Sequence, residues 1–305
     1  MTKDLPLTAN ADANINIAAN ANTVPVFNKT KTISDMLSFL ETKGCNHNEY
    51  HHYTDLESVI KMFDSGYFHL TCGDSTAMND QHEWQAKGSH ETWKRTYIGC
   101  FAFGESENMA MWGLYSLPWE DAVRISIPRK AMTNWINNTH NIYSVSFHNG
   151  TCERDLLPVQ AVVKLSDIVY INGKRNSNSS KLFWNDKSLA LSDTPELIGI
   201  DQRAEMTGFI KNDAWRYENE VRIHIQLENK VSTDKIAIKL SDDIIPSMTI
   251  TAGPYFSGDL LQRIEEKIPQ IVHRKQTNQS GFKHLVNYKT LCGMCMHNEF
   301  QRKAR

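Results

Sequence analysis

The chain has 305 residues, with 33 Lys and Arg against 35 Asp and Glu, which gives a formal net charge of −2. This balance lacks the basic excess typical of duplex nucleic-acid binding, and no run of about 18 apolar residues occurs that could cross a membrane. With 40% hydrophobic residues, the chain is long enough to bury a core in one large domain or two small ones.

The two ends of the chain differ in composition from the middle. Residues 1–31 are rich in Ala and Asn and lack the basic-then-apolar layout of a secretory signal, so we expect a disordered leader. We expect a single α+β domain over residues 32–275 and an extension over residues 276–305. The cysteines are irregularly spaced, which favours free thiols in a reducing cytoplasm over a disulfide framework. They are Cys45, Cys72, Cys100, Cys152, Cys292 and Cys295.

The first structured elements alternate between helix and strand. Ser34 is expected to cap a helix that ends at Gly44. Thr54 and Glu57 form the pattern of a capping box, which predicts a second helix that ends at Gly66. Strands are predicted on either side of that helix, over residues 49–53 and 67–71.

Strands dominate the rest of the chain. A helix is expected from Pro128 to Trp135, another over residues 195–211 and a third over residues 260–268, and residues 173–180 form an expected loop. Further strands are predicted over residues 97–103, 123–127, 142–147, 159–165, 167–171, 220–227, 236–240 and 248–251. This pattern predicts an α+β fold with a mixed, largely antiparallel sheet and peripheral helices.

Four strings of polar and aromatic residues could carry chemistry. They are YHHYT at residues 50–54, MNDQHEW at 78–84, MWGLY at 111–115 and WRYENEVR at 215–222. In this order, over roughly residues 51–268, they resemble the bacterial domain-of-unknown-function family numbered 2971. That resemblance implies no established activity.

A second resemblance implies an activity. ADP-ribosyltransferases of the His-Tyr-Glu type carry a His on an early strand, often as H-x-T, then a Tyr or Ser near a second strand, and a Glu at the start of a later strand. His52, Tyr115 and Glu220 occur here in that order, and the string from Glu218 to Val221 is similar to the E-x-E-V of some members. The resemblance implies an ADP-ribosyltransferase-like fold and NAD as the substrate. Because it rests on motif order, it is an analogy at the level of the fold.

The implied chemistry is the cleavage of the nicotinamide–ribose bond, which leaves positive charge on the ribose. Glu220 would stabilise that charge and bind the 2′-hydroxyl, while Glu218 would orient the acceptor or act as a weak base. His52 would bind a ribose hydroxyl and Tyr115 would stack on nicotinamide. The expected NAD-binding set also includes Tyr53, Thr54 and Trp112, and the expected supporting set is Asn79, Asp80, Glu83, Trp215 and Arg222.

The implied function is ADP-ribosyl transfer or NAD glycohydrolysis, with an unidentified acceptor and, by analogy, a role as a toxin or defence effector. Structural interpretations of the same residues stay open. Thr54 is also a helix cap, Trp112 and Tyr115 are also spaced as a core stripe, and His52 is also a structural histidine. Glu218, Glu220 and Arg222 also fit a solvated strand face. Asn79, Asp80 and Glu83 also fit a turn and a helix cap, or a set of partners for Arg222 or Arg216.

Two other functions compete with the transferase. One is a non-catalytic module that binds a nucleotide or a protein. The other is a metal-dependent hydrolase that uses the histidines near residues 47–82, although no known metal-binding spacing occurs there. The Cys292-x-x-Cys295-x-His297 string is a single CxxC without a second pair, so no metal ligand is assigned.

Overall fold

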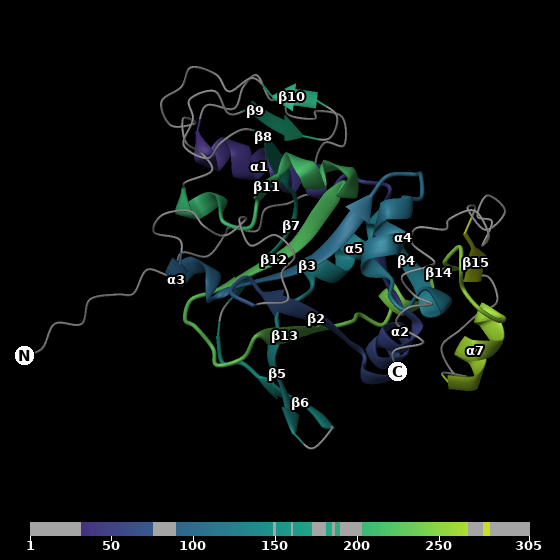
Figure 1. The fold of residues 1–305 in the computed structure, drawn as a ribbon. Helices are drawn as coiled ribbons and strands as arrows, with labels where there is room; N and C mark the ends of the chain where they lie inside the picture. The colour runs from purple at the N-terminus through teal and green to yellow at the C-terminus, as the bar shows by residue number, and fades with distance from the viewer. Residues whose placement is uncertain are drawn as a thin grey trace, which may run out of the picture.

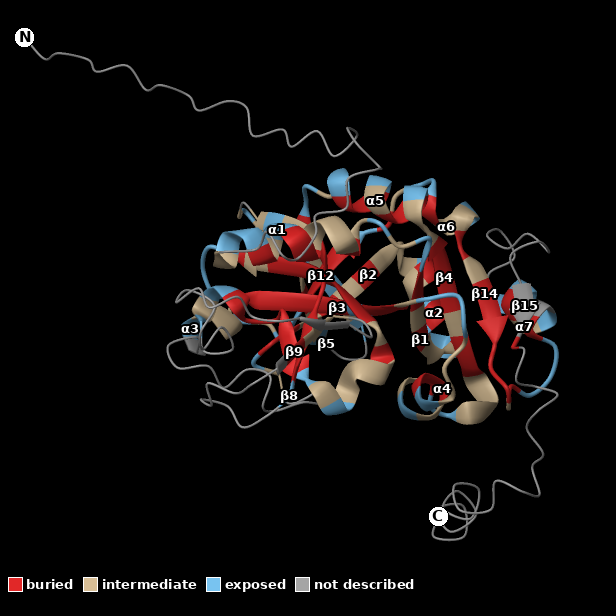
Figure 2. Cartoon of the chain, turned by 90° about the horizontal axis from the view of Figure 1, so that it is seen from above, coloured by how far each residue is buried: buried red, intermediate tan, exposed pale blue. Residues whose placement is uncertain are grey.

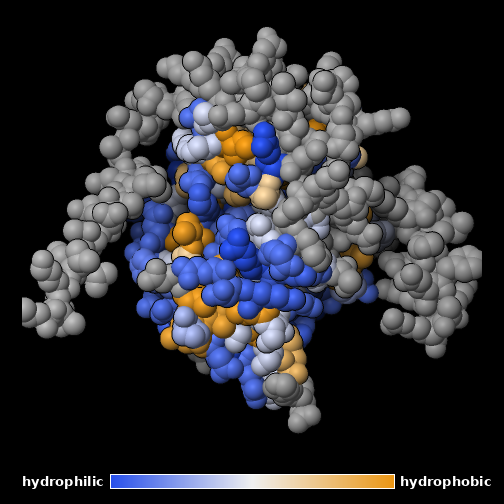
Figure 3. Space-filling view, turned by 90° about the vertical axis from the view of Figure 1, so that its left-hand side faces the viewer, coloured by the Kyte–Doolittle hydropathy of each residue, from blue (hydrophilic) through white to orange (hydrophobic). Residues whose placement is uncertain are grey.

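The computed structural model describes residues 32–75, 90–148, 151–159, 161–172, 181–184, 187–189, 203–267 and 277–280. The predicted leader at residues 1–31, the loop at 173–180 and nearly all of the predicted extension lie outside these residues. Within them, no helix has the length and hydrophobicity needed to span a bilayer. On the side shown in Figure 3, hydrophilic side chains cover much of the described surface, with smaller hydrophobic areas between them.

A large sheet organises the described residues (Figure 1). Its strands are β1 (Glu49–Asp55), β2 (Tyr67–Cys72), β3 (Thr96–Phe103), β4 (Ala122–Pro128), β5 (Ile142–His148), β6 (Thr151–Leu156), β7 (Ala161–Asp167), β12 (Glu220–Leu227), β13 (Lys235–Lys239), β14 (Thr249–Ala252) and β15 (Thr277–Gln279). Every neighbouring pair in it is antiparallel except β14 with β15. The prediction of a largely antiparallel sheet is therefore confirmed.

A smaller sheet has the strand order β10-β9-β8-β11. Its strands are β8 (Val169–Asn172), β9 (Lys181–Trp184), β10 (Lys187–Leu189) and β11 (Ile210–Asn212). The helices are α1 (Ile33–Gly44), α2 (Leu56–Ser65), α3 (His90–Trp93), α4 (Met109–Tyr115), α5 (Arg129–Asn137), α6 (Ile244–Ser247) and α7 (Leu260–Lys267). In the part of the chain that the structure describes, the 3-10 helices are η2 (Trp119–Asp121), η5 (Ala204–Met206) and η6 (Asp213–Glu218).

The main core lies on one face of the large sheet. Figure 2 shows α1, α5 and α6 along one side of the buried strands and α4 on the other side. Alternate residues of the strands, such as Val221 and Ile223, are fully buried with residues of α2, α5 and α6. Trp135 of α5 packs edge-on against Phe68 of β2, with 5.7 Å between the ring centroids. The opposite face carries α4 and a smaller cluster of buried residues that includes Tyr53, Ala102 and Trp112.

Strand β3 divides its pairing among three neighbours. One edge pairs with β12 along its length, from Ala102 with Glu220 to Thr96 with Gln226. The other edge pairs with β1 only at residues 102 and 103, and with β2 only at residues 97 and 98. Strands β1 and β2 therefore diverge beside residues 99–101, and this split positions the cavity described below.

Two helix starts differ from the prediction. Thr32 caps α1 in a capping box with Asp35, so the prediction of Ser34 was wrong. The cap of α2 is Asp55, whose side chain accepts from the Ser58 amide, whereas Thr54 pairs inside β1 with Val123 of β4. Strand pairing thus extends past the expected cap. Gly66 ends α2 in the left-handed conformation, as predicted.

The helix predicted over residues 195–211 is wrong in its described part. Residues 204–206 form η5, and β11 pairs in parallel with β8, Ile210 lying beside Val169. The strands predicted at 159–165 and 167–171 begin two residues later, as β7 and β8. The other predicted strands and the helices at Pro128 and near residue 260 are confirmed, while β6, β9, β10 and β15 were not predicted.

Gly44, at the end of α1, offers a test of how closely this helix packs on the sheet. A Cβ atom there would lie 2.6 Å from the Ser166 Cα and 2.7 Å from the Leu165 carbonyl oxygen, both backbone atoms of β7. We expect Gly44→Ala to lower the free energy of unfolding by about 1–3 kcal/mol, because the backbone must shift.

The control is Gly113→Ala in α4, where a Cβ meets nothing within 4 Å. It should leave stability unchanged or raise it by up to about 1 kcal/mol, since Ala favours helices. Urea unfolding of the wild type and both variants measures this. Equal stability of the two variants would contradict the close packing.

Candidate functional site

A cavity of about 260 Å³ lies at the split between β1 and β2. Its walls come from segments far apart in the chain, which the sheet brings together. Strands β1, β2 and β3 supply His51, His52, Tyr53, Phe68, His69, Thr71, Ile98, Gly99, Cys100, Phe101 and Ala102. The other side is formed by Met111, Tyr115, Lys211, Glu218, Glu220 and Arg222.

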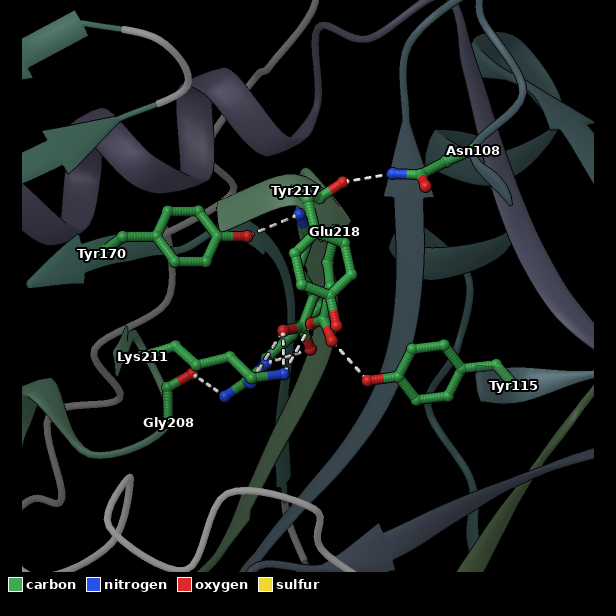
Figure 4. Close-up of polar contacts among 9 residues, drawn as sticks. Asn108, Tyr115, Tyr170, Gly208, Lys211, Tyr217 and Glu218 are labelled. Carbon is green, nitrogen blue, oxygen red and sulfur yellow. Dashed lines mark hydrogen bonds and ion pairs between the residues drawn. The ribbon is translucent and has the colours of Figure 1, made fainter. Parts of the chain in front are cut away.

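A sharp turn before β12 brings two carboxylates together. Asn219 ends η6 in the left-handed conformation, with φ 45°, which Asn tolerates better than most residues. Glu218 and Glu220 lie on either side of this turn, and both bind the ammonium group of Lys211. The Nζ atom is 2.6 Å from an oxygen of Glu218 and 3.1 Å from one of Glu220 (Figure 4).

Glu220 also binds Arg222 of its own strand. The Arg222 Nε and Nη2 atoms donate to the two carboxylate oxygens of Glu220 at 2.7 and 3.0 Å, and Nη1 donates to the Gly208 carbonyl at 2.7 Å. Glu220 is only 4% exposed and Arg222 only 1%. Burial raises the pKa of Glu220, but the charges of Arg222 and Lys211 outweigh that effect, so the net pKa is lowered. Glu220 is therefore a fixed anion.

The pKa of Glu218 is shifted in the opposite direction. Its carboxylate accepts a hydrogen bond from the Tyr115 hydroxyl, which ties α4 to the end of η6 (Figure 4). Burial and the neighbouring charge of Glu220 raise the pKa of Glu218 to about 7, although Lys211 opposes them. Two adjacent carboxyl groups with pKa values pushed apart are typical of acid–base sites. Glu218 can therefore exchange a proton near neutral pH.

The cavity histidines are neutral. His52 has its Nδ1 2.9 Å from the Cys100 carbonyl, at the point where β3 lacks a partner on that edge, so Nδ1 donates and Nε2 is left as an acceptor. Burial lowers the pKa of His52. Burial and the charge of Arg124 lower that of His51 to about 4, and its nitrogens bond with Ser126 and Gly104. Among the described residues, no group of three His, Cys, Asp or Glu is placed to hold a metal ion.

The predicted site residues divide into three groups. The cavity is lined by His52, Tyr53, Tyr115, Glu218, Glu220 and Arg222. Three residues are not in its lining, namely Thr54, Trp112 and Trp215, although the Trp215 ring lies 5.1 Å from the Lys211 Nζ and Trp112 packs on Tyr53. The third group, Asn79, Asp80 and Glu83, lies outside the described residues, as does the string of Cys292, Cys295 and His297, to which no role was assigned.

The interpretation of Glu218, Glu220 and Arg222 as a solvated strand face is wrong, because all three are buried. The reason is that η6 and β11 fold over this end of β12. Sequence reasoning also missed Lys211, Cys100 and His69. Lys211 is an isolated lysine inside a stretch that was predicted to be helical, so no pattern marks it. Only the parallel pairing of β11 with β8 brings it to the two carboxylates.

Residues 111–223 match the model of a family described as "Protein of unknown function (DUF2971)". The match covers just over a third of the chain and includes Tyr115, Lys211 and the carboxylate pair. It supports the predicted resemblance to this family. No curated protein and no solved structure matches the chain. These comparisons give no support to a relationship with ADP-ribosyltransferases, which stays a prediction.

The raised pKa of Glu218 predicts a pH-dependent stability. The folded protein binds this proton more tightly than the unfolded chain, whose Glu pKa is about 4.3. The resulting stabilisation is full below that value and is lost as the pH rises through about 7. The free energy of unfolding of the wild type minus that of Glu218→Gln should therefore fall from about pH 5 to about pH 8.

Urea unfolding at intervals across this range measures the difference. Glu228→Gln, which changes an exposed carboxylate just after β12, is the matched control and should give a nearly constant difference. A wild-type-minus-Glu218→Gln difference that stays flat or increases with pH would show that Glu218 does not hold its proton in the folded state.

Proposed function

We propose that the chain is an NAD-consuming enzyme that cleaves the nicotinamide–ribose bond and transfers the ADP-ribosyl group to an acceptor or to water. The observation that supports this most is the composition of one cavity. His52 of β1, Tyr115 of α4 and the carboxylates of Glu218 and Glu220 line the same hollow, although they lie far apart in the sequence.

Each of these groups has a place in the reaction. When the bond between ribose C1′ and the pyridinium nitrogen breaks, its electron pair neutralises the nicotinamide ring and leaves positive charge on the ribose. The fixed anion Glu220 would face that charge and bind the 2′-hydroxyl. Glu218 would take a proton from the attacking acceptor or water. The free Nε2 of His52 would accept a hydrogen bond from a ribose hydroxyl.

The size of the cavity limits which part of NAD it can hold. At about 260 Å³ it is smaller than the roughly 300–1,000 Å³ of sites for whole drug-sized ligands. It suits the nicotinamide and its ribose, with Tyr115 as the aromatic wall. The pyrophosphate and the adenosine would then lie outside it, on the surface of the sheet.

A second candidate is a binding module that holds the nucleotide without cleaving it. The observation that favours it is the engagement of Glu220 by both Arg222 and Lys211, because the two cations offset the negative charge that would stabilise a ribosyl cation. A metal-dependent hydrolase has less support in the described residues, since His51, His52 and His69 each bond at least one ring nitrogen to a protein group.

The test is incubation of the protein with NAD, following nicotinamide release and the labelling of proteins in a lysate. We expect Glu218→Gln and Glu220→Gln each to lower the rate by at least about 100-fold. Tyr115→Phe keeps the ring and removes the hydrogen bond to Glu218, so a smaller loss is expected. Glu228→Gln is the control and should be as active as the wild type.

Three outcomes separate the hypotheses. Nicotinamide release that depends on Glu218 supports the enzyme. Binding of NAD by calorimetry with no release supports the binding module and removes the enzyme. If the wild type neither binds NAD nor releases nicotinamide, both nucleotide hypotheses are wrong.

A further inference from the structure

The face of the large sheet that carries the cavity continues past it. Strand β13 pairs with β2, Lys235 opposite Thr71 and Ala237 opposite His69, and β5 and β6 follow in the strand order. Directly paired residues share a face of the sheet. Since His69 and Thr71 line the cavity, Lys235 and Ala237 lie on the same face beside it.

Arg154 of β6 reaches across this face to the cavity wall. Its Nη2 donates to the His69 Nε2 at 3.3 Å. Its guanidinium lies over the ring of Tyr67 with 4.9 Å to the centroid, which fixes its orientation. Ala237 lies on the strand between β2 and β5, and its small side chain leaves room for this approach.

The charges of Arg154 and Lys235 are available to a ligand. Within the described part of the chain neither residue forms an ion pair, and the Nε of Arg154 is buried without a hydrogen-bond partner. The acidic neighbours Glu153 and Asp155 alternate with Arg154 along β6 and so point to the opposite face. Lys235 is exposed.

The pKa of His69 reflects the positive charge at this rim of the cavity. Burial lowers its pKa, and the charges of Arg154 and Lys235 lower it further, to about 4. Lys211 and Arg222, on the other side of the cavity, differ from these two cations because carboxylates neutralise them. The cavity therefore has one rim where positive charge faces solvent without an anion.

We propose that Arg154 and Lys235 form a phosphate-binding site at the rim of the cavity, where they hold the pyrophosphate of a nucleotide whose sugar occupies the cavity. The assignment of that nucleotide as a dinucleotide rests on the proposed function. A planar guanidinium matches two phosphate oxygens, and an ammonium adds a mobile point charge. Strand β13 lies two strand spacings from β3, about 10 Å, so the site is close enough for one ligand to reach both places.

The experiment measures binding of ADP-ribose by calorimetry, because this ligand carries the pyrophosphate and needs no bond cleavage. We expect R154Q and K235Q each to weaken binding about 10-fold and the double variant about 100-fold. The control is Lys130→Gln, which removes an exposed cation from α5 on the other side of the sheet and should bind like the wild type. Lys235 is exposed, so K235Q tests the proposal even if the Arg154 variant does not fold.

Salt and kinetics give two further readouts. Raising the ionic strength should weaken ADP-ribose binding to the wild type more than to the double variant. In an active enzyme the double variant should raise KM for NAD about 100-fold with kcat changed less than about threefold, since the phosphate contacts are made equally before and during reaction.

Failure of this proposal is distinguishable from failure of the proposed function. If the wild type binds neither ADP-ribose nor inorganic pyrophosphate, or if the double variant binds ADP-ribose as tightly as the wild type, the phosphate site is wrong. Binding that depends on Arg154 and Lys235 without any nicotinamide release supports the phosphate site and removes the proposed function. Cleavage of NAD with KM unchanged in the double variant removes the phosphate site alone.

Discussion

Four buried ionisable side chains hold the site together. Lys211, Glu218, Glu220 and Arg222 form a cluster in which two cations contact two carboxyl groups, and each of the four side chains is at most 4% exposed. Removing one partner from such a cluster leaves an uncompensated buried charge, which typically costs about 3–5 kcal/mol. The cluster connects β11, η6 and β12, and through Tyr115 it also holds α4. The cavity wall depends on all of them.

The same cluster shifts the pKa values of two chemically identical side chains, Glu218 and Glu220, in opposite directions. Glu220 accepts two hydrogen bonds from Arg222 and one from Lys211, which keeps it ionised. Glu218 has the Lys211 ammonium and the Tyr115 hydroxyl, and the charge of Glu220 acts against its ionisation. A carboxyl group that exchanges a proton beside one that does not is a useful arrangement for a reaction that develops positive charge and also moves a proton.

The second constraint is the divided pairing of β3. Strands β1 and β2 each pair with only one end of β3, so the Cys100 carbonyl has no strand partner on that edge. It accepts a hydrogen bond from the His52 ring instead. An uninterrupted sheet would close this space with strand hydrogen bonds. The split thus places neutral, hydrogen-bonding side chains on one side of the cavity and the charged cluster on the other. The cations of Arg154 and Lys235 extend the site along the sheet.

The sequence by itself determined many of the local elements of this protein and the order of its motifs. Some elements are encoded by the pattern of neighbouring residues. Examples are the alternation in residues 220–227, the apolar run at residues 97–103 and Gly66 at the end of α2. The tertiary structure decided that Asp55 rather than Thr54 caps α2, that residues 210–212 form a strand, and that Lys211 meets Glu218 and Glu220. These outcomes depend on which strands pair over long distances, on backbone conformation at Asn219 and on the exclusion of water from the cluster. Periodicity along the chain carries no information about such pairing, so the polar face of β12 resembled a solvated surface until the fold buried it.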